Sequence, residues 1–363
     1  MKLKEITRFL EEIAPLAYQE DYDNSGLLVG DPNADITAAL ISLDCTETVL
    51  DEAIRKGCNL IVSHHPIVFK GLKKFNGKNY VERVVMKAIK HDIALYAIHT
   101  NLDNVMHGVN RALGEKLGLT QLQILAPKTG ILKKLITYVP QSHADAVRAA
   151  LFAAGAGHIG DYDECSFNID GFGTFKAGEG ADPFVGKIGE QHRESETKIE
   201  IVYTYDIENQ ILEALFQAHP YEEVAHDLYV LSNAHPQIGS GMLGYLAQEQ
   251  SELDFLKMVK AQLGVPVIRH TALKGKKVKK VAICGGSGSF LLPWAIRAGA
   301  DLFITADYKY HEFFDADSQI VIADVGHYES EQFTQTLLFE TITKKFPKFA
   351  LHLTEQHTNP INY

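Results

Sequence analysis

The sequence predicts an α/β protein, α+β overall, in which two related α/β halves flank an inserted ferredoxin-like domain. Three observations lead to this class. In the first and last thirds of the 363 residues, helical segments alternate with short apolar runs, which is typical of parallel strand–helix units. The middle third shows a different order of elements. A stretch of the first third also aligns with a stretch of the last third without a gap.

The first third is expected to hold a helix followed by buried strands. Near the N-terminus, Phe9, Leu10 and Ile13 have the spacing of an amphipathic helix, and this segment lacks the uninterrupted apolar run of a signal peptide. Apolar runs at residues 38–43, 60–62 and 93–98 predict strands with mostly parallel pairing.

The middle third is expected to form the inserted domain, residues 126–237. Its predicted elements are a strand at 135–139, a helix at 144–154, polar Gly-rich strands, a strand at 198–203, a helix at 208–218 and a strand at 225–230. This β-α-β-β-α-β order is that of a ferredoxin-like unit.

The last third returns to the first pattern, with strands predicted at 278–284, 302–305 and 320–323. Residues 53–65 align with residues 295–307 without a gap. Each stretch contains a helix, a glycine turn, an apolar strand and a polar tip. A weak internal repeat would make the two halves related units around one site. The alternative is that any helix-Gly-strand unit resembles another.

The overall composition limits the classes of partner. A formal net charge of −11 at pH 7 argues against general nucleic-acid binding, because affinity for phosphate backbones comes from clustered Lys and Arg. No apolar stretch approaches the ~20 residues of a membrane span. Four cysteines, at positions 45, 58, 165 and 284, form no CxxC pair and indicate reduced, buried thiols. We therefore expect a cytoplasmic protein that does not bind membranes.

Two histidines stand at the tip of the strand predicted at 60–62. His64 and His65 follow this strand, and ligands of parallel α/β sheets bind at the carboxyl ends of strands. Successive strand side chains point to opposite faces, so the pair suits two neighbouring ions better than one ion. The alternative is a pair of loop histidines that cap the strand.

The strand predicted at 93–98 leads into His99 and Asp103. Asp103 is an oxygen donor placed to bind or bridge metal ions, and its alternative role is a helix cap ahead of the segment at 105–117. His99 is interpreted as an acid-base residue, a partner of a metal ligand or a hydrogen-bonded core residue.

A third strand tip carries His327 and Glu331. These residues are four apart and share one face of a first helical turn, as metal ligands on helices do. A solvated pair at this spacing is the alternative for the motif taken alone.

The three strand tips together deliver three histidines and two carboxylates to one edge. A catalytic zinc site uses three protein ligands and a water, so five donors exceed the needs of one ordinary site. Two divalent ions about 3.5 to 4 Å apart would use all five donors and lower the pKa of a bridging water. Glu331 is the expected bridge. The donors suit Zn, Fe, Mn or Co.

At five places the sequence resembles the Nif-three-like family, also called GTP cyclohydrolase I type 2 homologues. The matching runs are Asp23-Asn24-Ser25-Gly26-Leu27-Leu28-Val29-Gly30, Ser63-His64-His65-Pro66, His99-Thr100-Asn101-Leu102-Asp103, Asp307-Tyr308-Lys309-Tyr310-His311 and Gly326-His327-Tyr328-Glu329-Ser330-Glu331. The resemblance spans the whole chain in the longer, insert-bearing form of the family. Tyr22 stands where the family usually has Trp, and Ala306 where it usually has Gly; neither position is a proposed ligand.

The resemblance implies a Nif-three-like dinuclear-metal core of residues 1–125 plus 238–363, with a signalling-protein-like, ferredoxin-like insert. It further implies two divalent metal ions per chain and a toroidal homo-oligomer, usually a hexamer. The implied metal ligands are His64, His65, Asp103, His327 and Glu331. Asp307 and His311, which join His99 as candidate catalytic residues, are expected to contact the ligands or the substrate, or else to form a structural turn.

A glycine-rich loop bears on the substrate. Gly285-Gly286-Ser287-Gly288-Ser289 follows the strand predicted at 278–284 and precedes a helix, so its backbone N–H groups could cradle an anion. This interpretation favours a phosphorylated or nucleotide substrate. A tight strand-to-helix turn is the alternative.

The leading functional hypothesis is a dinuclear metal-dependent hydrolase in which metal-activated water attacks a small-molecule or nucleotide-like substrate. The resemblance implies GTP cyclohydrolysis, which opens the purine imidazole ring and releases formate, although a phosphoesterase would use the same ligands. The alternative class is a metal-binding regulatory or scaffold protein with a ligand-sensing insert. His99, Asp307 and His311 favour an enzyme, because a metal store needs no acid-base residues. A ring around nucleic acid would need a basic inner surface, which the net charge disfavours.

Overall fold

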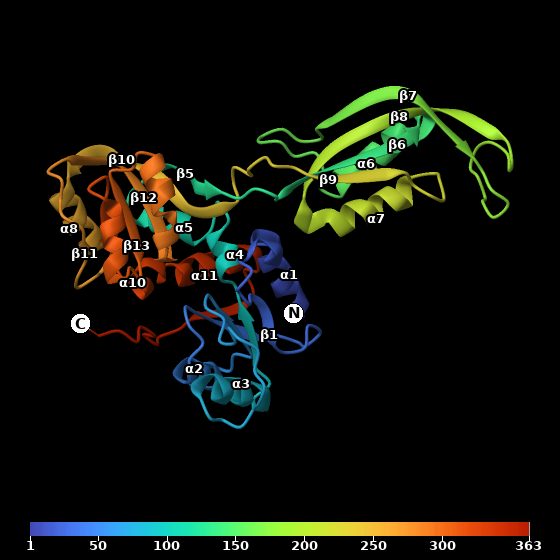
Figure 1. The fold of residues 1–363 in the computed structure, drawn as a ribbon. Coiled ribbons are helices and arrows are strands. Elements are labelled where there is room, and N and C mark those ends of the chain that lie inside the picture. The colour runs from blue at the N-terminus through green and yellow to red at the C-terminus, as the bar shows by residue number, and fades with distance from the viewer. Residues whose placement is uncertain (363) are drawn as a thin grey trace. The chain divides into compact units, whose positions relative to one another are not determined.

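The chain is a mixed α/β protein with three sheets (Figure 1). The computed structural model describes residues 1–362, which form two compact units. Unit 1 joins residues from both ends of the chain, Met1–Pro127 and Pro236–Tyr363, and unit 2 is Lys128–His235. The α/β class predicted from the sequence is confirmed at this level. The predicted domain ranges stay a prediction, and position 363 at the end of one range lies outside the described residues.

The first sheet of unit 1 has the strand order β1-β4-β3-β2-β15. Its strands are β1 (Gly26–Val29), β2 (Ala38–Ser42), β3 (Leu60–Ser63), β4 (Ala94–Ala97) and β15 (Ala350–Leu353). From β4 to β15 neighbouring strands are parallel, whereas β1 is antiparallel to β4. β2, β3 and β4 are buried along their whole length, as expected for parallel strands covered on both faces. Their carboxyl ends therefore meet at one edge.

The helices before and between these strands are α1 (Leu3–Ile13), α2 (Glu47–Lys56) and α3 (Tyr80–Lys90). The Thr46 side chain caps α2 by accepting a hydrogen bond from the Val49 N–H at 3.3 Å, and Gly57 ends it with φ +69°. Gly299, the aligned glycine of the second half, follows α9 (Leu292–Arg297), has φ +68° and precedes β13 (Leu302–Ala306). The two aligned segments thus share one local structure.

The second sheet of unit 1 has the order β11-β14-β13-β12-β10-β5. Its remaining strands are β5 (Thr120–Pro127), β10 (Gly239–Ser251), β11 (Arg269–His270), β12 (Lys277–Ser287) and β14 (Val321–Asp324). The remaining helices of unit 1 are α4 (Thr100–Asp103), α5 (Val109–Lys116), α8 (Glu252–Leu263), α10 (His327–Glu331) and α11 (Thr334–Lys345). β12, β13 and β14 are parallel, and the other pairs are antiparallel.

Both faces of this second sheet are apolar. Leu302 and Ile304 belong to one buried cluster, whereas Phe303, between them, belongs to another. This alternation follows from the two-residue period of a strand, and it explains why the central strands read as continuous apolar runs. The antiparallel strands β5 and β10 were not predicted, because their sequences mix polar and glycine residues with the apolar ones.

Unit 2 contains, in chain order, β6 (Leu132–Pro140), α6 (Ala144–Ala153), β7 (Ser166–Lys176), β8 (Gln191–Thr204), α7 (Glu208–Ala218) and β9 (His226–Val230). The strand order is β7-β8-β6-β9, and every pair is antiparallel. Alternate strand residues such as Leu135 and Ile199 pack against Leu151 of α6 and Leu215 of α7 to form the core of this unit.

Short 3₁₀ turns complete the described structure. They are η1 (Leu16–Tyr18), η2 (Gln141–His143), η3 (Tyr205–Ile207), η4 (Ser289–Leu291) and η5 (Tyr310–Ala316). Among residues 1–362, no helix has both the length and the apolar character needed to cross a membrane.

Replacing Glu52 with glutamine is expected to destabilise unit 1 by about 1–2 kcal/mol at pH 7. The Glu52 side chain is buried and accepts hydrogen bonds from Lys56 Nζ at 2.7 Å, Thr354 Oγ1 at 2.5 Å and the Glu355 N–H at 3.0 Å. Burial alone would raise the pKa of Glu52, but the hydrogen bonds from Lys56 and Thr354 hold it below its ordinary value of 4.5.

A group with a lowered pKa stabilises the folded state fully above the unfolded pKa, and this contribution is lost as the pH falls through the folded pKa. The difference in melting temperature between the wild type and Glu52→Gln should therefore be largest at pH 7 and shrink below pH 4.5. Glu249→Gln, which removes an exposed ion pair with Lys277, is the control and should change little. An equal gap at pH 3 and pH 7 for Glu52→Gln would contradict this account.

Candidate metal centre

One cavity of unit 1, about 490 Å³ in volume, collects the strand tips of both sheets. Five of the residues singled out from the sequence line it: His65, His99, Asp103, His327 and Glu331. They come from the ends of β3, β4 and β14 and from the helices α4 and α10 that follow. The carboxyl edges of parallel strands therefore bring together residues that are more than 260 positions apart in the sequence.

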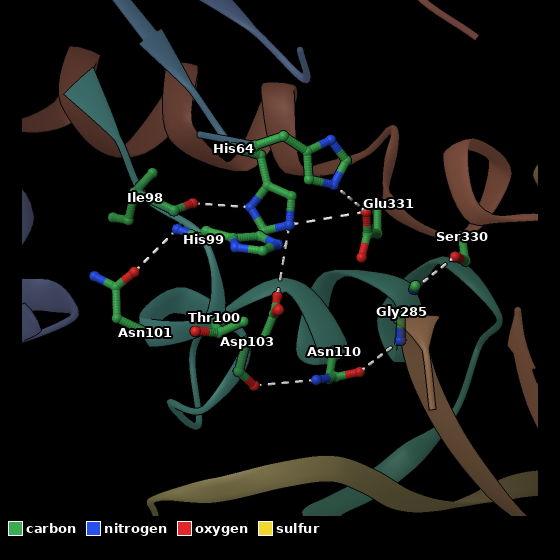
Figure 2. Close-up of polar contacts among 12 residues, drawn as sticks. His64, Ile98, His99, Thr100, Asn101, Asp103, Asn110, Gly285, Ser330 and Glu331 are labelled. Carbon is green, nitrogen blue, oxygen red and sulfur yellow. Dashed lines mark hydrogen bonds and ion pairs between the residues drawn. The ribbon is translucent and has the colours of Figure 1, made fainter. Parts of the chain in front are cut away.

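His64 is fully buried beside this cavity, with one ring nitrogen unused. Its Nδ1 donates to the Ile98 carbonyl oxygen at 2.8 Å, which leaves Nε2 as an acceptor. Nε2 lies 3.7 Å from Asp103 Oδ1 and 3.8 Å from Glu331 Oε2, too far for hydrogen bonds. Figure 2 shows His64 directed at both carboxylates.

Two buried polar atoms without partners indicate that the cluster suits a metal ion. Within the described residues, His64 Nε2 and Asp103 Oδ1 are buried and have no hydrogen-bond partner. Leaving such atoms unpaired costs about 1–3 kcal/mol each. A cation between them would satisfy both, and imidazole nitrogen with carboxylate oxygen is an ordinary donor set for divalent metals. The residues present therefore fit a metal ion.

Glu331 lies at the centre of the cluster. Its Oε2 is 3.0 Å from His65 Nε2 and 3.0 Å from His327 Nε2, and these two imidazole nitrogens are 3.3 Å apart. His327 and Glu331 are the first and last residues of α10. The predicted shared helical face therefore places both side chains in the same cluster.

Three overlapping groups of donors could hold metal ions. One is His64, Asp103 and Glu331, and another is His65, His327 and Glu331; in each, the donor atoms lie within 4.8 Å of one another. Glu331 is common to both. The third group is His64, His65 and His99, so the structure also brings His99, which the sequence reasoning set apart from the ligands, into the donor cluster.

Each half-buried imidazole of the cluster is oriented by a carboxylate. Nδ1 of His65 donates to Asp44 at 2.7 Å, Nδ1 of His327 to Asp307 at 2.6 Å, and Nδ1 of His99 to Asp23 at 2.7 Å. Such partners fix the ring and leave Nε2 for a metal or a proton.

Sequence reasoning missed the orienting role of Asp44 and Asp23. Asp44 follows β2 at the same edge of the sheet as His64, so the strand-tip argument could have found it. Asp23 stands between η1 and β1, outside any predicted strand tip, and no local pattern indicates its contact with His99.

Positively charged imidazoles and negatively charged carboxylates lie close together in the cluster. Burial alone would lower the pKa of both His65 and His327, but neighbouring carboxylates raise them to about 9 and about 11. The charge of His327 is the main reason why the pKa of Glu331 lies well below its usual range despite burial. Burial and the Glu331 charge raise the pKa of Asp103. The imidazolium charges thus offset the carboxylates that divalent cations would neutralise.

The carboxylates that orient the histidines are ionised. The hydrogen bond from His327 lowers the pKa of Asp307. Burial alone would raise the pKa of Asp44, but the hydrogen bond and charge of His65 hold it below its ordinary value. Ionised partners are the form that accepts an Nδ1–H bond, so the Nε2 atoms stay directed at the cluster.

The sequence suggested that the glycine loop could cradle an anion. Its first two N–H groups, those of Gly285 and Gly286, do not do so, because protein oxygens already accept their hydrogen bonds. The Gly285 N–H donates to Asn110 Oδ1 at 2.9 Å and the Gly286 N–H donates to Ser330 Oγ at 2.9 Å. Asn110 also donates to the Asp103 carbonyl oxygen at 3.0 Å, so it joins β12 to α4 (Figure 2). The loop instead positions the ligand-bearing segments.

His311, the last of the candidate catalytic residues, lies in η5 and is exposed. Its ring contacts Tyr310 and Phe314. His311 is not one of the described residues that line the cavity. The structure therefore brings together seven of the eight candidate residues, with Asp307 joining through His327.

The fold and the site define a mixed α/β protein with a buried His-carboxylate cluster that could hold metal. The model of the family described as Duf34/NIF3 (NGG1p interacting factor 3) matches residues 1–360. The chain belongs to this family, as the sequence resemblance implied.

Relatives of similar length support this assignment. A protein of Halalkalibacterium halodurans named GTP cyclohydrolase 1 type 2 homolog is 42% identical over 324 residues, covering 89% of this chain and 87% of its own. One of Bacillus subtilis with the same name is 38% identical over 370 residues, covering 99% of this chain and 98% of its own. The crystal structure of a Bacillus cereus protein related to NIF3 superposes with a TM-score of 0.85 at 38% identity, covering 100% and 99% of the two chains.

Proposed function

We propose that the protein is a dinuclear metal-dependent hydrolase acting on a nucleotide-like substrate. The observation that carries the proposal is the pair of overlapping donor groups that share Glu331. In this proposal His64 and Asp103 would hold one ion, His65 and His327 would hold the other, and Glu331 would be a donor in both groups. Divalent ions bound there would activate water and offset negative charge that develops on the substrate.

His99 is proposed to act as the general acid-base residue, which takes a proton from water and returns it to the leaving group. Its Nδ1–H donates to Asp23 at 2.7 Å, which leaves Nε2 as the other ring nitrogen, and the side chain lines the cavity. A neutral imidazole in this position can take a proton from water and return it to a leaving group. Asp307 positions His327 through Nδ1. His311, outside the cavity lining, has no part in the proposal.

The walls of the cavity suit a substrate with a planar ring. Tyr22 and Phe69 are exposed, line the cavity and lie with ring centroids 6.3 Å apart. Phe290 is a further exposed aromatic side chain in the lining. Aromatic faces stack on bases, which agrees with GTP as the first substrate to test, as the names of the relatives suggest.

The test is metal content and formate release from GTP for the purified wild type and a His64→Ala, Glu331→Ala double variant. We expect about two equivalents of metal and formate release for the wild type, and loss of both in the variant. A His192→Ala, Glu194→Ala double variant is the matched control, because it removes a bonded His–Glu pair of unit 2. Absence of metal from the wild type, or its retention in the double variant, would refute the proposal.

A second candidate is a metal-binding regulatory protein whose inserted domain senses a ligand. One observation favours it: unit 2 has its own cavity of about 720 Å³, lined by aromatic side chains that include Phe172, Phe175 and Tyr221. Two metal equivalents with no turnover of GTP or of phosphoesters would favour this candidate.

The insert and the assembly are also matters of proposal. The β-α-β-β-α-β order of unit 2 with an antiparallel sheet supports a ferredoxin-like fold. The toroidal hexamer stays a prediction that light scattering on the purified protein would test.

A further inference from the structure

The segment that follows β15 runs toward the candidate metal centre. β15 pairs in parallel with β2, with Leu353 opposite Ile41. The chain after β15 therefore leaves the sheet at the edge where Asp44 follows β2 and where His64 and His65 follow β3. Residues 354–361, here called the C-terminal strap, begin at this edge.

The start of the C-terminal strap is anchored on α2. Thr354 Oγ1 donates to Glu52 Oε2 at 2.5 Å, and the Glu355 N–H donates to Glu52 Oε1 at 3.0 Å. The Thr354 N–H also donates to the Ile41 carbonyl oxygen at 2.9 Å, which continues the pairing with β2. Because the Glu52 side chain is buried, these bonds fix the direction in which the strap leaves the sheet.

Three consecutive residues of the strap then contact the supports of the metal cluster. The His357 ring packs against Tyr328 with centroids 4.7 Å apart. Thr358 Oγ1 donates to Asp44 Oδ2 at 2.5 Å, and Asn359 Nδ2 donates to Glu329 Oε1 at 2.9 Å.

Two of these contacts hold α10 and one holds Asp44. Tyr328 and Glu329 lie in α10 between its terminal residues His327 and Glu331, which are the proposed ligands. After these contacts, Asn359, Pro360 and Ile361 line the cavity. The strap therefore touches the supports of the cluster and reaches the cavity wall.

The Thr358 contact completes the coordination of a single carboxylate. Asp44 offers Oδ1 to Nδ1 of His65 at 2.7 Å and Oδ2 to Thr358 at 2.5 Å. With both oxygens engaged, the carboxylate has one orientation. Without the hydroxyl of Thr358, Asp44 could rotate about its last side-chain bond, and the ring of His65 would lose its fixed direction toward Glu331.

We propose that the C-terminal strap is a working part of the metal centre and that Thr358 is a positioning residue for His65, acting through Asp44. The inference rests on the proposed function in that His65 is taken as a metal ligand. It assigns a role to a segment that carries no metal donor of its own in the cluster. Losing a partner that orients a ligand typically weakens metal affinity about 10- to 100-fold.

The test is a Co²⁺ titration of the metal-free full-length protein, followed by visible absorption, for the wild type and two variants. Thr358→Val removes the hydroxyl at nearly constant volume, and we expect its Co²⁺ affinity to fall about tenfold with an altered absorption band. Thr358→Ser keeps the hydroxyl and should restore both. Thr120→Val is the matched control, because Thr120 Oγ1 donates to the Tyr245 carbonyl oxygen in β10 and Thr120 is not among the described residues that line the cavity, so its Co²⁺ affinity should equal that of the wild type.

The outcomes separate this inference from the proposed function. Co²⁺ uptake by the wild type with equal affinity and the same spectrum in Thr358→Val overturns the strap proposal alone. No Co²⁺ uptake by the wild type overturns both proposals. A purely structural role would lower the melting temperature of Thr358→Val without moving its affinity or spectrum, and this result also overturns the positioning role.

Discussion

Alanine at position 286 is expected to abolish most of the metal binding while leaving the chain folded. A Cβ atom at Gly286 would lie 2.3 Å from Glu331 Oε1 and 3.2 Å from His327 Cε1. The Glu331 carboxylate would have to swing away to relieve the contact. It is buried and lies 3.0 Å from both His65 and His327, so the movement would break the cluster at its common residue.

Gly286 also has φ +63°, and alanine there carries a backbone strain of about 1–2 kcal/mol. Gly299→Ala is the matched control, since Gly299 has φ +68° and a Cβ atom there would meet no atom of the described residues within 4 Å. The backbone strain should be similar in the two variants, and Gly286→Ala should lose further stability through its contact with Glu331. Only Gly286→Ala should fall well below the wild type in metal per chain, measured by elemental analysis after dialysis against Zn²⁺. Equal metal content in the two variants would contradict the central role given to Glu331.

The clustering of the candidate residues could be predicted because they stand at strand tips. His64 and His65 directly follow β3, His99 stands two residues after the end of β4, and His327 follows β14. In a parallel sheet the carboxyl ends share one edge, so identifying the strands was sufficient to bring these side chains together. Glu331 followed from its helical spacing to His327.

The role of the glycine loop and the position of His311 depend on contacts that leave no local pattern in the sequence. The Gly285 and Gly286 N–H groups look free in the sequence, but Asn110 and Ser330, which are distant along the chain, already accept their hydrogen bonds. His311 stands near Asp307, yet η5 turns it to the surface.

In the fold too, some elements could be predicted from the sequence and others could not. Apolar runs that are buried on both faces, such as β3 and β13, were found from the sequence. β10 was missed because its second half is exposed and polar, and its place beside β12 depends on pairing across the sheet. The path of residues 354–361 over the site was not predicted either, since it is set by Glu52 and Asp44.

Replacing Asp23 with alanine is expected to destabilise unit 1 by about 3 kcal/mol. The Asp23 side chain is fully buried and accepts hydrogen bonds from His99 Nδ1 at 2.7 Å, the Thr100 N–H at 3.0 Å and the Asn24 N–H at 2.7 Å. The Thr100 hydroxyl also donates to it. Despite burial, His99 and Thr100 hold the pKa of Asp23 well below its usual range, so the carboxylate is charged throughout the working pH range.

The Asp23→Asn variant keeps the volume of the side chain and removes its negative charge, so it shows how much of the stability depends on the charge. An asparagine would direct an NH₂ group at donors that now face a carboxylate oxygen, so we expect a loss of stability comparable to that of the alanine variant. The control is Asp35→Ala, which removes an exposed ion pair with Lys2 and should have little effect. Urea unfolding gives the free energies. If the Asp23 variants were as stable as the control, the hydrogen bonds to this carboxylate would not hold α4 to the segment between η1 and β1.

The same variants test the proposal that His99 transfers a proton while other residues bind the metal ions. Asp23 orients His99, which is proposed to carry a proton, whereas the proposed metal ligands are held by Ile98, Asp44 and Asp307. Below its unfolding transition, Asp23→Asn should therefore keep nearly the wild-type metal content and lose most of its turnover. If it lost metal in proportion to activity, His99 would belong with the ligands, as the donor group of His64, His65 and His99 allows.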